Sequence, residues 1–378
     1  MMHLCSSGHN TFVQRMFGRA VHCLGKIGDE LYIDPENDSV TFRTVNSSWS
    51  TFICFKFFNK FFASYQADSI SGNGDHIVKC KVSLKACLGV FRSLSTIEKV
   101  VDKCDLSLCS NESKMIFKLH CKHNVVKTYN LPFIECETLE GAFEKDSCCN
   151  NIVAHSRLLA DVAANFQTSQ DEITLCVKDR VTTIKNYVDD EPDPSKVVHT
   201  VMSLEAEEFS EYNITSETEV TFCLKELRAL LFFSEFSNLP VHIHFDNGGK
   251  PIIFSNENEE IFVVNFVMAT LEESATSQSV TSGGIERLSQ NKNTRDENEN
   301  DANSNLHEPL DSANLEEVPS DFFQNDSDWT SEDIVIASPP KKKFREEKAK
   351  FLGMLDFTIQ PTVSFKNSEV LAPESDED

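Results

Sequence analysis

Residues 82–94 read VSLKACLGVFRSL, and residues 221–233 read TFCLKELRALLFF. In both segments a short apolar strand leads through a Leu-Lys pair into an amphipathic helix, so that Lys85 corresponds to Lys225. Each helix precedes a three-strand meander: CDLSLCS, SKMIFKLHC and NVVKTYNL in the first case, and PVHIHFD, KPIIFS and IFVVNFVMATL in the second. The sequence therefore predicts a duplicated unit of strand, helix and meander.

The stretches that precede these two units are also alike. Each begins with a predicted helix, over residues 13–27 and 157–166. Strands follow it, namely ELYIDP, SVTFRTVN and STFICFKF in the first half, and EITLCVK and VTTIKNYV in the second. A helix–strand repeat used four times is predicted. The opening segment MHLCSSGHNTFVQRM, residues 2–16, is poorly strand-like, which leaves the start of the first half open.

The charge of the chain is divided between a body and a tail. The 378 residues carry a formal net charge of −25. Residues 273–378 hold 23 acidic and 10 basic residues, which leaves 37 acidic and 25 basic residues in the first 272. Because it is charged and poor in apolar residues, the tail is predicted to be disordered. An acidic chain argues against a nucleic-acid partner, unless its basic residues gather on one surface.

The cysteines indicate a reduced compartment. All 13 lie between Cys5 and Cys223, without a paired CxxC framework, and residues 1–20 lack the apolar stretch of a secretory signal. We therefore expect intracellular thiols that pack as small hydrophobic groups. No apolar run approaches the length that crosses a bilayer, so no membrane span is predicted.

A basic stripe marks the first predicted helix, VQRMFGRAVHCLGKIG at residues 13–28. On a helical wheel its apolar residues share one broad face, and the opposite face carries Arg15, Arg19, His22 and Lys26. The corresponding exposed positions of the later helices are Lys85 and Arg92, and Lys225 and Arg228 on either side of Glu226. Two interpretations stay open: a solvated outer face, or a surface for a phosphate backbone.

Several long motifs are similar to a known family. They are GRAVHCLGKIGDELYIDP, FRTVNSSWSTFICFKFFNKFFASYQ, VFRSL, VVKTYNL, TFCLKELRALLFFSE and NFVMATL, within residues 17–272. Together they resemble the Rad-nine family, whose members are PCNA-like subunits of a heterotrimeric DNA-damage checkpoint clamp. This resemblance implies an α+β fold with two PCNA-like (DNA clamp) domains, with helices lining the hole and antiparallel sheets outside. The domains would be residues 1–130 and 152–272, with a connector at 131–151 and a regulatory tail at 273–378.

The resemblance also implies a role. The chain would be a nuclear, non-enzymatic subunit that needs no cofactor or metal. With two other PCNA-like subunits, and a clamp loader to place it, it would encircle double-stranded DNA at damage sites without sequence specificity. The basic residues named above would face the DNA. A phosphorylated tail would recruit a BRCT-repeat scaffold and a checkpoint kinase, in support of DNA repair. Trp49 stands where the family pattern suggests a basic residue.

The tail carries short signals of its own. A predicted nuclear-localisation cluster consists of Lys341, Lys342, Lys343 and Arg345. The predicted phosphorylation sites are Ser338, which precedes a proline, and Ser375 and Thr330, which precede acidic residues. The apolar run at residues 351–357 is expected to dock on a folded partner or on the clamp itself.

Other functions were weighed against a clamp. A metal-dependent 3'-5' exonuclease would need convergent carboxylates, but Asp34, Glu36, Asp189 and Glu191 are expected to be solvated loop acids. The His120-Cys121-Lys122-His123 run lies in a predicted strand, where neighbours point to opposite faces. A homotrimeric replication processivity clamp is disfavoured by the long tail. Residues 24–30 also resemble a pro-apoptotic, groove-binding helix motif, although the core is expected to use Leu24 and Ile27.

Overall fold

The computed structural model describes the chain except for residues 1, 6–10, 68–77, 189–197, 273–356 and 360–378. The described part contains three larger antiparallel sheets, one two-stranded sheet and five α-helices. The helices are α1 (Thr11–Gly25), α2 (Leu84–Val90), α3 (Leu94–Val100), α4 (Ser156–Ala164) and α5 (Leu224–Ser237). None of the described helices has the length and apolar composition needed to cross a bilayer.

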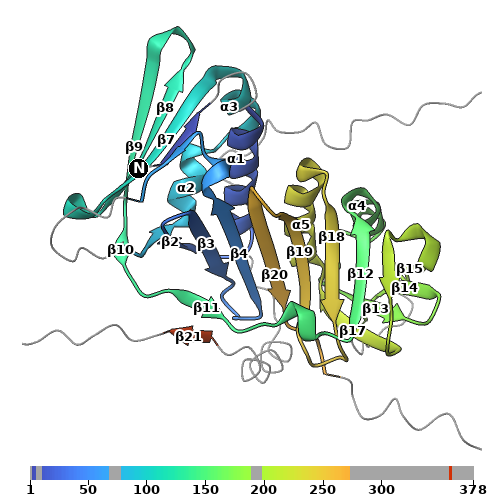
Figure 1. Cartoon of the computed structure of the whole chain (residues 1–378). Helices are drawn as coiled ribbons and strands as arrows, with labels where there is room; N and C mark the ends of the chain where they lie inside the picture. Colours follow the sequence, from blue (N-terminus) through green and yellow to red (C-terminus); the bar gives the residue numbers. More distant parts are fainter. Residues whose placement is uncertain (1, 6–10, 68–77, 189–197, 273–356, 360–378) are drawn as a thin grey trace, which may run out of the picture. The chain divides into compact units, whose positions relative to one another are not determined.

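A ten-stranded sheet runs through the middle of the molecule (Figure 1). Its order is β10 (Ile134–Glu135), β6 (Cys80–Ser83), β2 (Glu30–Pro35), β3 (Ser39–Val45), β4 (Thr51–Phe58), β20 (Phe262–Met268), β19 (Ile252–Asn258), β18 (Pro240–Phe245), β12 (Asn150–His155) and β16 (Glu211–Asn213). Strand β4 of the first half pairs with β20 of the second half over seven residues, from Thr51 opposite Met268 to Phe57 opposite Phe262. The two halves therefore share one hydrogen-bonded sheet.

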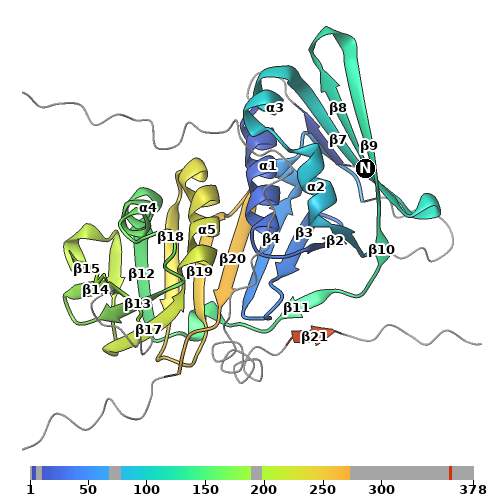
Figure 2. The ribbon, with the colours of Figure 1, turned by 180° about the vertical axis from the view of Figure 1, so that it is seen from behind.

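Two smaller sheets lie at the two ends of the molecule (Figures 1 and 2). The first has the order β5 (Ser64–Tyr65), β1 (Met2–Cys5), β7 (Val101–Cys109), β8 (Lys114–Cys121) and β9 (Val125–Pro132). The second has the order β15 (Val201–Glu205), β14 (Val181–Asn186), β13 (Glu172–Val177) and β17 (Thr218–Cys223). Each ends in a strand, β9 or β15, that has one described neighbour.

The strand orders confirm the internal repeat predicted from the sequence. The first half arranges its strands as β6-β2-β3-β4 and as β5-β1-β7-β8-β9. The second half repeats both patterns, as β17-β13-β14-β15 and as β16-β12-β18-β19-β20. In this correspondence β4 is equivalent to β15, and β9 is equivalent to β20. The pairing of β4 with β20 joins the two halves. Their counterparts in the repeat, β15 and β9, remain at the edges of the two smaller sheets.

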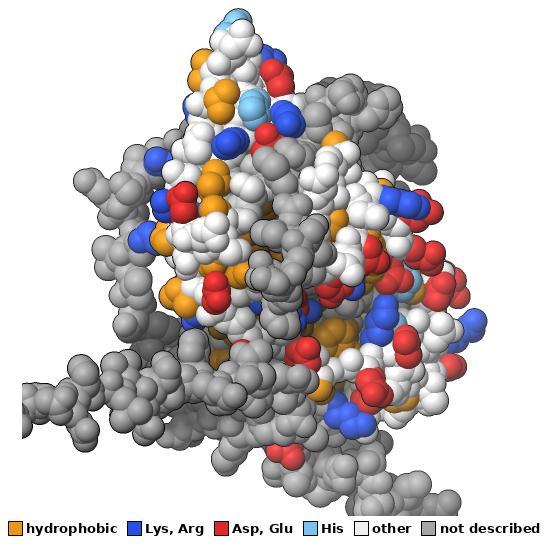
Figure 3. Space-filling model, turned by 60° about the vertical axis from the view of Figure 1, so that its left-hand side comes forward, with side chains coloured by type: hydrophobic (Ala, Val, Ile, Leu, Met, Phe, Trp, Pro, Cys, Tyr) orange, Lys and Arg blue, Asp and Glu red, His pale blue; other side chains and the backbone are white. Residues whose placement is uncertain are grey.

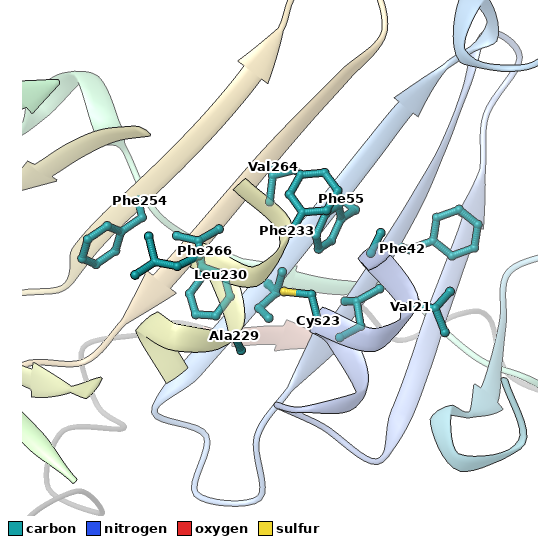
Figure 4. Packing of buried hydrophobic residues seen from close by; sticks show 14 of the residues in the cluster. Val21, Cys23, Phe42, Phe55, Ala229, Leu230, Phe233, Phe254, Val264 and Phe266 are labelled. Atoms are coloured by element: carbon teal, nitrogen blue, oxygen red, sulfur yellow. The ribbon is translucent and has the colours of Figure 1, made fainter. Parts of the chain in front are cut away.

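The helices cover one face of the central sheet (Figure 2). Alternation along β4 explains the division of faces, because Ile53, Phe55 and Phe57 turn to the helix side and are fully buried. On that side Phe55 meets Phe233 of α5 edge to face, with the ring centroids 4.8 Å apart. Figure 4 shows α1 and α5 packing beside each other over this aromatic core. One continuous core therefore joins the two halves.

The opposite face of the sheet is covered by the connector between β9 and β12. A small cluster there joins Phe52, Leu139, Ile253 and Val267, and Trp49 packs against it. Trp49 lies in the turn between β3 and β4 at a φ of 56°, so it serves this cluster on the side away from the helices. The connector strand β11 (Leu139–Gly141) pairs with β21 (Phe357–Ile359), which lies at the end of the predicted docking run. At these residues the tail contacts the folded body of the chain.

Two elements add to the sequence prediction. The opening segment, whose start the sequence left open, forms a strand, β1, between β5 and β7, so main-chain pairing compensates for its weak strand composition. A fifth helix, α3, lies between Ser93 and Val101. The Ser93 side chain accepts a hydrogen bond from the backbone N–H of Thr96 at its start, a capping signal that the periodicity did not reveal.

The turn after α1 depends on a glycine. Gly28 is buried, and its backbone N–H donates to the carbonyl of Leu24, which is itself 1% exposed. A side chain at Gly28 would clash with Thr44 and would lie 2.7 Å from the carbonyl oxygen of Val45. The groove-binding resemblance of residues 24–30 would thus require the chain to open here, because Leu24 belongs to the core.

We expect Gly28→Ala to lower the free energy of unfolding by about 2 kcal/mol or more, because strand β3 would have to move. Gly89 in α2 is the matched control, since an added methyl group would meet nothing within 4 Å. Gly89→Ala should leave stability unchanged or raise it by up to about 1 kcal/mol, as helix propensity favours Ala. Urea unfolding of both variants checks this. Equal effects from the two substitutions would contradict the packing described here.

Candidate nucleic-acid interface

The basic stripe of α1 lies against two aromatic rings of α5. Arg15 and Arg19 both place their guanidinium groups 4.8 Å from the ring centroid of Phe236, and Arg19 lies 4.6 Å from that of Phe232. Arg19 also donates a 3.2 Å hydrogen bond to the backbone carbonyl of Phe232. Arg15 is ion-paired with Glu98 of α3 at 2.5 Å. These cations therefore join neighbouring helices as well as carrying charge.

The other two residues of the stripe are also engaged. The ammonium group of Lys26 lies 4.2 Å from the ring centroid of Phe232. Although the Lys26 side chain is exposed as a whole, burial around its ammonium group lowers its pKa. His22 is 2.8 Å from the carbonyl oxygen of Phe91, where its Nε2–H donates, which ties α1 to the end of α2. The positive charge of α1 is thus partly desolvated.

Three of the other predicted basic residues are exposed. Lys85 lies in the first turn of α2, Arg92 follows the end of that helix, and Lys225 lies in the first turn of α5. Their helices pack on the sheet through the opposite side, as the buried residues Leu84 and Leu224 show. These three cations point to solvent on the helix-covered face, where they can meet phosphate groups.

Arg228 differs from its prediction as an outward-facing residue. Its guanidinium group donates to the backbone carbonyls of Ala163, in the last turn of α4, and Phe166, just after that helix, at 3.0 and 2.9 Å. These carbonyls have no partner within α4, so Arg228 caps the helix. Burial lowers its pKa. The neighbouring Glu226 accepts hydrogen bonds from Asn46 and Thr51, which attaches the β3–β4 turn to α5.

Two acidic residues of the second half lie on neighbouring helices, which was not predicted from the sequence. Asp161 of α4 and Glu235 of α5 are both exposed. Burial first, and then the charge of Asp161, raise the pKa of the Glu235 carboxyl, while Arg157 and Arg19 act in the opposite direction. The Glu235 carboxyl therefore responds to charges on α1 and α4 as well as to its own burial. Both acids are visible in the sequence, but their neighbourhood depends on the packing of the helices.

Two of the four carboxylates considered for an exonuclease, Asp34 and Glu36, are ion-paired. Asp34 is 6% exposed rather than solvated, since it lies at the end of β2 and accepts from Arg43 at 3.1 Å and from Thr138 at 3.1 Å. Burial alone would raise the pKa of Glu36, but hydrogen bonds from Lys56 and Ser39 hold it below its ordinary value. Asp189 and Glu191 lie outside the described residues.

The strand predicted through residues 120–123 ends at Cys121, and Lys122–Asn124 form a 3-10 turn, which separates the two histidines. His120 lies 2.9 Å from the Asp105 carboxylate, while Cys121 is buried in the core and His123 turns away at a φ of 61°. No group of three or more His, Cys, Asp or Glu side chains in the described residues could hold a metal ion.

Most of the exposed apolar side chains lie at the edges of the two smaller sheets. In the described part of the chain, the large hydrophobic residues that are exposed are Val125, Val126, Ile134, Val188, Val198 and Val201. The first two lie on β9, Ile134 lies on β10 at one edge of the ten-stranded sheet, and the other three lie on or beside β14 and β15. Hydrophobic and basic side chains share the surface of the projecting β8–β9 hairpin (Figure 3). Apolar edge strands of this kind are templates for pairing with another chain.

The predicted tail sites lie outside the described residues. They are Thr330, Ser338, Lys341, Lys342, Lys343, Arg345 and Ser375.

Comparison with known families and sequences gives one answer. Residues 17–271 match the Rad9 family. The chain is 30% identical over 257 residues to the cell cycle checkpoint control protein Rad9 of Drosophila melanogaster, which is 68% of this chain and 54% of the fly protein. It is 27% identical over 281 residues to the DNA repair protein rad9 of Schizosaccharomyces octosporus, covering 66% of this chain and 65% of that protein. The chain thus spans less than two thirds of either relative.

Solved structures show the fold. The proliferating cellular nuclear antigen (PCNA) of Thermococcus kodakaraensis superposes with a TM-score of 0.56 at 15% identity, covering 71% of this chain and all of that one. A chain of the PCNA2–PCNA3 complex of Sulfolobus tokodaii gives 0.54 at 16% identity, covering 71% of this chain and 98% of that one. The chain therefore has the PCNA-like clamp fold that its sequence predicted.

We expect Lys26→Met and Phe232→Leu to be energetically coupled, because the ammonium group lies over that ring. A double-mutant cycle measured by urea unfolding should give a coupling free energy of about 0.5–1 kcal/mol. The control cycle pairs Phe232→Leu with Lys85→Met, whose exposed cation lies on α2, and its coupling should be near zero. If the coupling free energy for Lys26 and Phe232 is no larger than that of the control cycle, the contact does not contribute to stability.

Proposed function

The chain belongs to the Rad9 family, and we propose that it is one of three different subunits of a clamp that encircles DNA in the damage checkpoint. We take residues 1–130 and 152–272 as its two clamp domains, residues 131–151 as their connector and residues 273–378 as a regulatory tail. The curated relatives are named as checkpoint control and DNA repair proteins. Function here consists of binding and recruitment rather than catalysis.

The equivalence of the edge strands carries this proposal. Within the chain, β4 of one half pairs with β20 of the other. Their repeat equivalents, β15 and β9, lie at opposite ends with one side unpaired in the described structure. If β9 of one chain pairs with the strand equivalent to β15 in the next chain, the contact between chains has the same form as the β4–β20 pairing within a chain. Such head-to-tail contacts close into a ring when the rotation is right.

The exposed apolar residues fit that arrangement. Val125 and Val126 on β9 are 48% and 52% exposed, and Val201 on β15 is 61% exposed. Isolated proteins seldom leave long apolar edge strands open, because these aggregate. Burial against a neighbouring subunit would remove the apolar surface at both ends, so we assign the two edges to two different partner subunits.

Duplex DNA fits the helix-covered face. In a closed ring this face, with Lys85, Arg92 and Lys225, would line the hole together with the cations of α1. Contacts of Lys and Arg with phosphates hold a duplex without reading its sequence, which suits a clamp that slides. The formal net charge of −25 is compatible with this, because only the local potential of the helix face acts on the DNA.

The tail supplies the signalling part of the proposal. We assign nuclear import to Lys341, Lys342, Lys343 and Arg345, and phosphate-dependent regulation to Ser338, Thr330 and Ser375. A phosphate on Ser375 would be followed by three acidic residues and would present a dianion to a basic pocket of a BRCT-repeat scaffold. That scaffold would bring the checkpoint kinase to the clamp, which a clamp loader places on DNA.

Ring assembly is tested with edge variants of the full chain. We expect Val125→Asp with Val126→Asp to weaken binding to one partner subunit at least about tenfold and to spare the other. Val201→Asp should do the reverse, because it changes the opposite edge. Pairwise affinity measurements and native mass spectrometry of the three-chain mixture check this.

Two results would contradict the proposed ring. One is loss of the same partner by both edge variants, since one chain could then not join two neighbours. The other is a ring formed by this chain alone, which would favour the homotrimeric processivity clamp.

For the tail, we expect Ser375→Ala to reduce binding of the BRCT-repeat scaffold about tenfold or more after treatment with an acidophilic kinase, because charge-assisted hydrogen bonds are lost. Ser364→Ala is the control, since Phe365 and Lys366 follow that serine rather than acids. Clamp assembly should be normal in both variants. Undiminished scaffold binding by Ser375→Ala would move the docking site elsewhere in the tail.

A further inference from the structure

The two halves of the helix face carry different charge. The helices lie in the order α2, α1, α5 and α4 (Figure 2). Around α1 and α2 the exposed cations are Lys26, Lys85 and Arg92, with Arg15 and Arg19 half-buried beside them. On α4 and α5 the exposed cations Arg157 and Lys225 are matched in number by the exposed acids Asp161 and Glu235.

Two acids of the first half lie near this face. Glu98 is ion-paired with Arg15. Asp29 follows the end of α1, and its backbone carbonyl accepts from the N–H of Leu84 at the start of α2. The five cations of α1 and α2 outnumber these two acids, so the first half keeps an excess of positive charge.

In the second half the exposed charges balance. Asp161 and Glu235 are exposed on α4 and α5, two helices that pack against each other, so their negative charge lies on the same part of the helix face. Arg228 does not offset it at the surface, because its guanidinium group is committed to the carbonyls of Ala163 and Phe166. A phosphate that approaches this junction meets as many negative as positive groups, and the Coulomb terms nearly cancel.

We propose that this chain holds duplex DNA through its α1–α2 half and keeps the DNA away from its α4–α5 half by means of Asp161 and Glu235. The duplex then lies off-centre along the arc that this subunit contributes to the hole. This inference rests on the proposed function, because it concerns where DNA touches the same helix face.

The experiment compares charge-matched pairs in the full chain, assembled with the other two clamp subunits. Lys85→Gln with Arg92→Gln should weaken binding to a duplex about tenfold and lower the salt slope of log Kd by about two. Arg157→Gln with Lys225→Gln removes the same charge from the other half and should change affinity less than about twofold. Asp161→Asn with Glu235→Gln should strengthen binding by several-fold. Its control is Glu140→Gln with Glu259→Gln, two exposed acids outside the helices, which should have no effect.

The outcomes separate this inference from the proposed function. The off-centre placement is overturned if the Arg157/Lys225 pair costs as much affinity as the Lys85/Arg92 pair, or if the Asp161/Glu235 pair behaves like its control. A wild-type assembly that fails to bind duplex DNA at low salt counts against the proposed function itself. Thermal unfolding of each variant shows that differences in binding do not arise from misfolding.

Discussion

The pairing of β4 with β20 is the constraint on which the rest of the molecule depends. It fuses the sheets of the two halves, so that α1 and α5 must lie side by side over one aromatic core. That neighbourhood explains the unusual use of Arg15, Arg19 and Lys26, whose charged groups lie on the rings of Phe232 and Phe236. On the opposite face the same pairing brings Phe52, Ile253 and Val267 together, and the connector packs on them.

The sequence predicted those features that depend on local periodicity. Alternation in ELYIDP and SVTFRTVN identified β2 and β3 nearly to the residue, and the duplicated segments identified the repeat and hence the fold class. Features that depend on distant neighbours were not accessible. A helical wheel placed Arg19 and Arg228 on an outer face, but it could not show that Arg19 meets Phe232 or that Arg228 caps α4. For the same reason Asp34 was expected in solvent, although the connector buries it.

Charge in this chain has to be considered by location. The total of −25 includes an acidic tail, outer-face ion pairs such as Asp34 with Arg43, and a helix face whose two halves differ. A duplex inside a ring responds to the helix face, because charges more than a Debye length away are screened. The cations of α1 have two tasks, since the same groups stabilise the seam between the halves and contribute to the potential. Charge reversal at these positions mixes stability with binding, whereas Lys85, an exposed cation of α2, separates them.

The repeat within the chain has a consequence for direction. Each subunit presents one strand of the β9 type and one of the β15 type, so neighbours in a ring follow one another in a single sense. A ring built in this way has two unlike faces, because every connector lies on the same side of it. Such a ring has a front and a back along the duplex it encircles. In the proposed ring, a protein that binds the connector side would meet the DNA from a defined direction, which a ring with two equivalent faces could not impose.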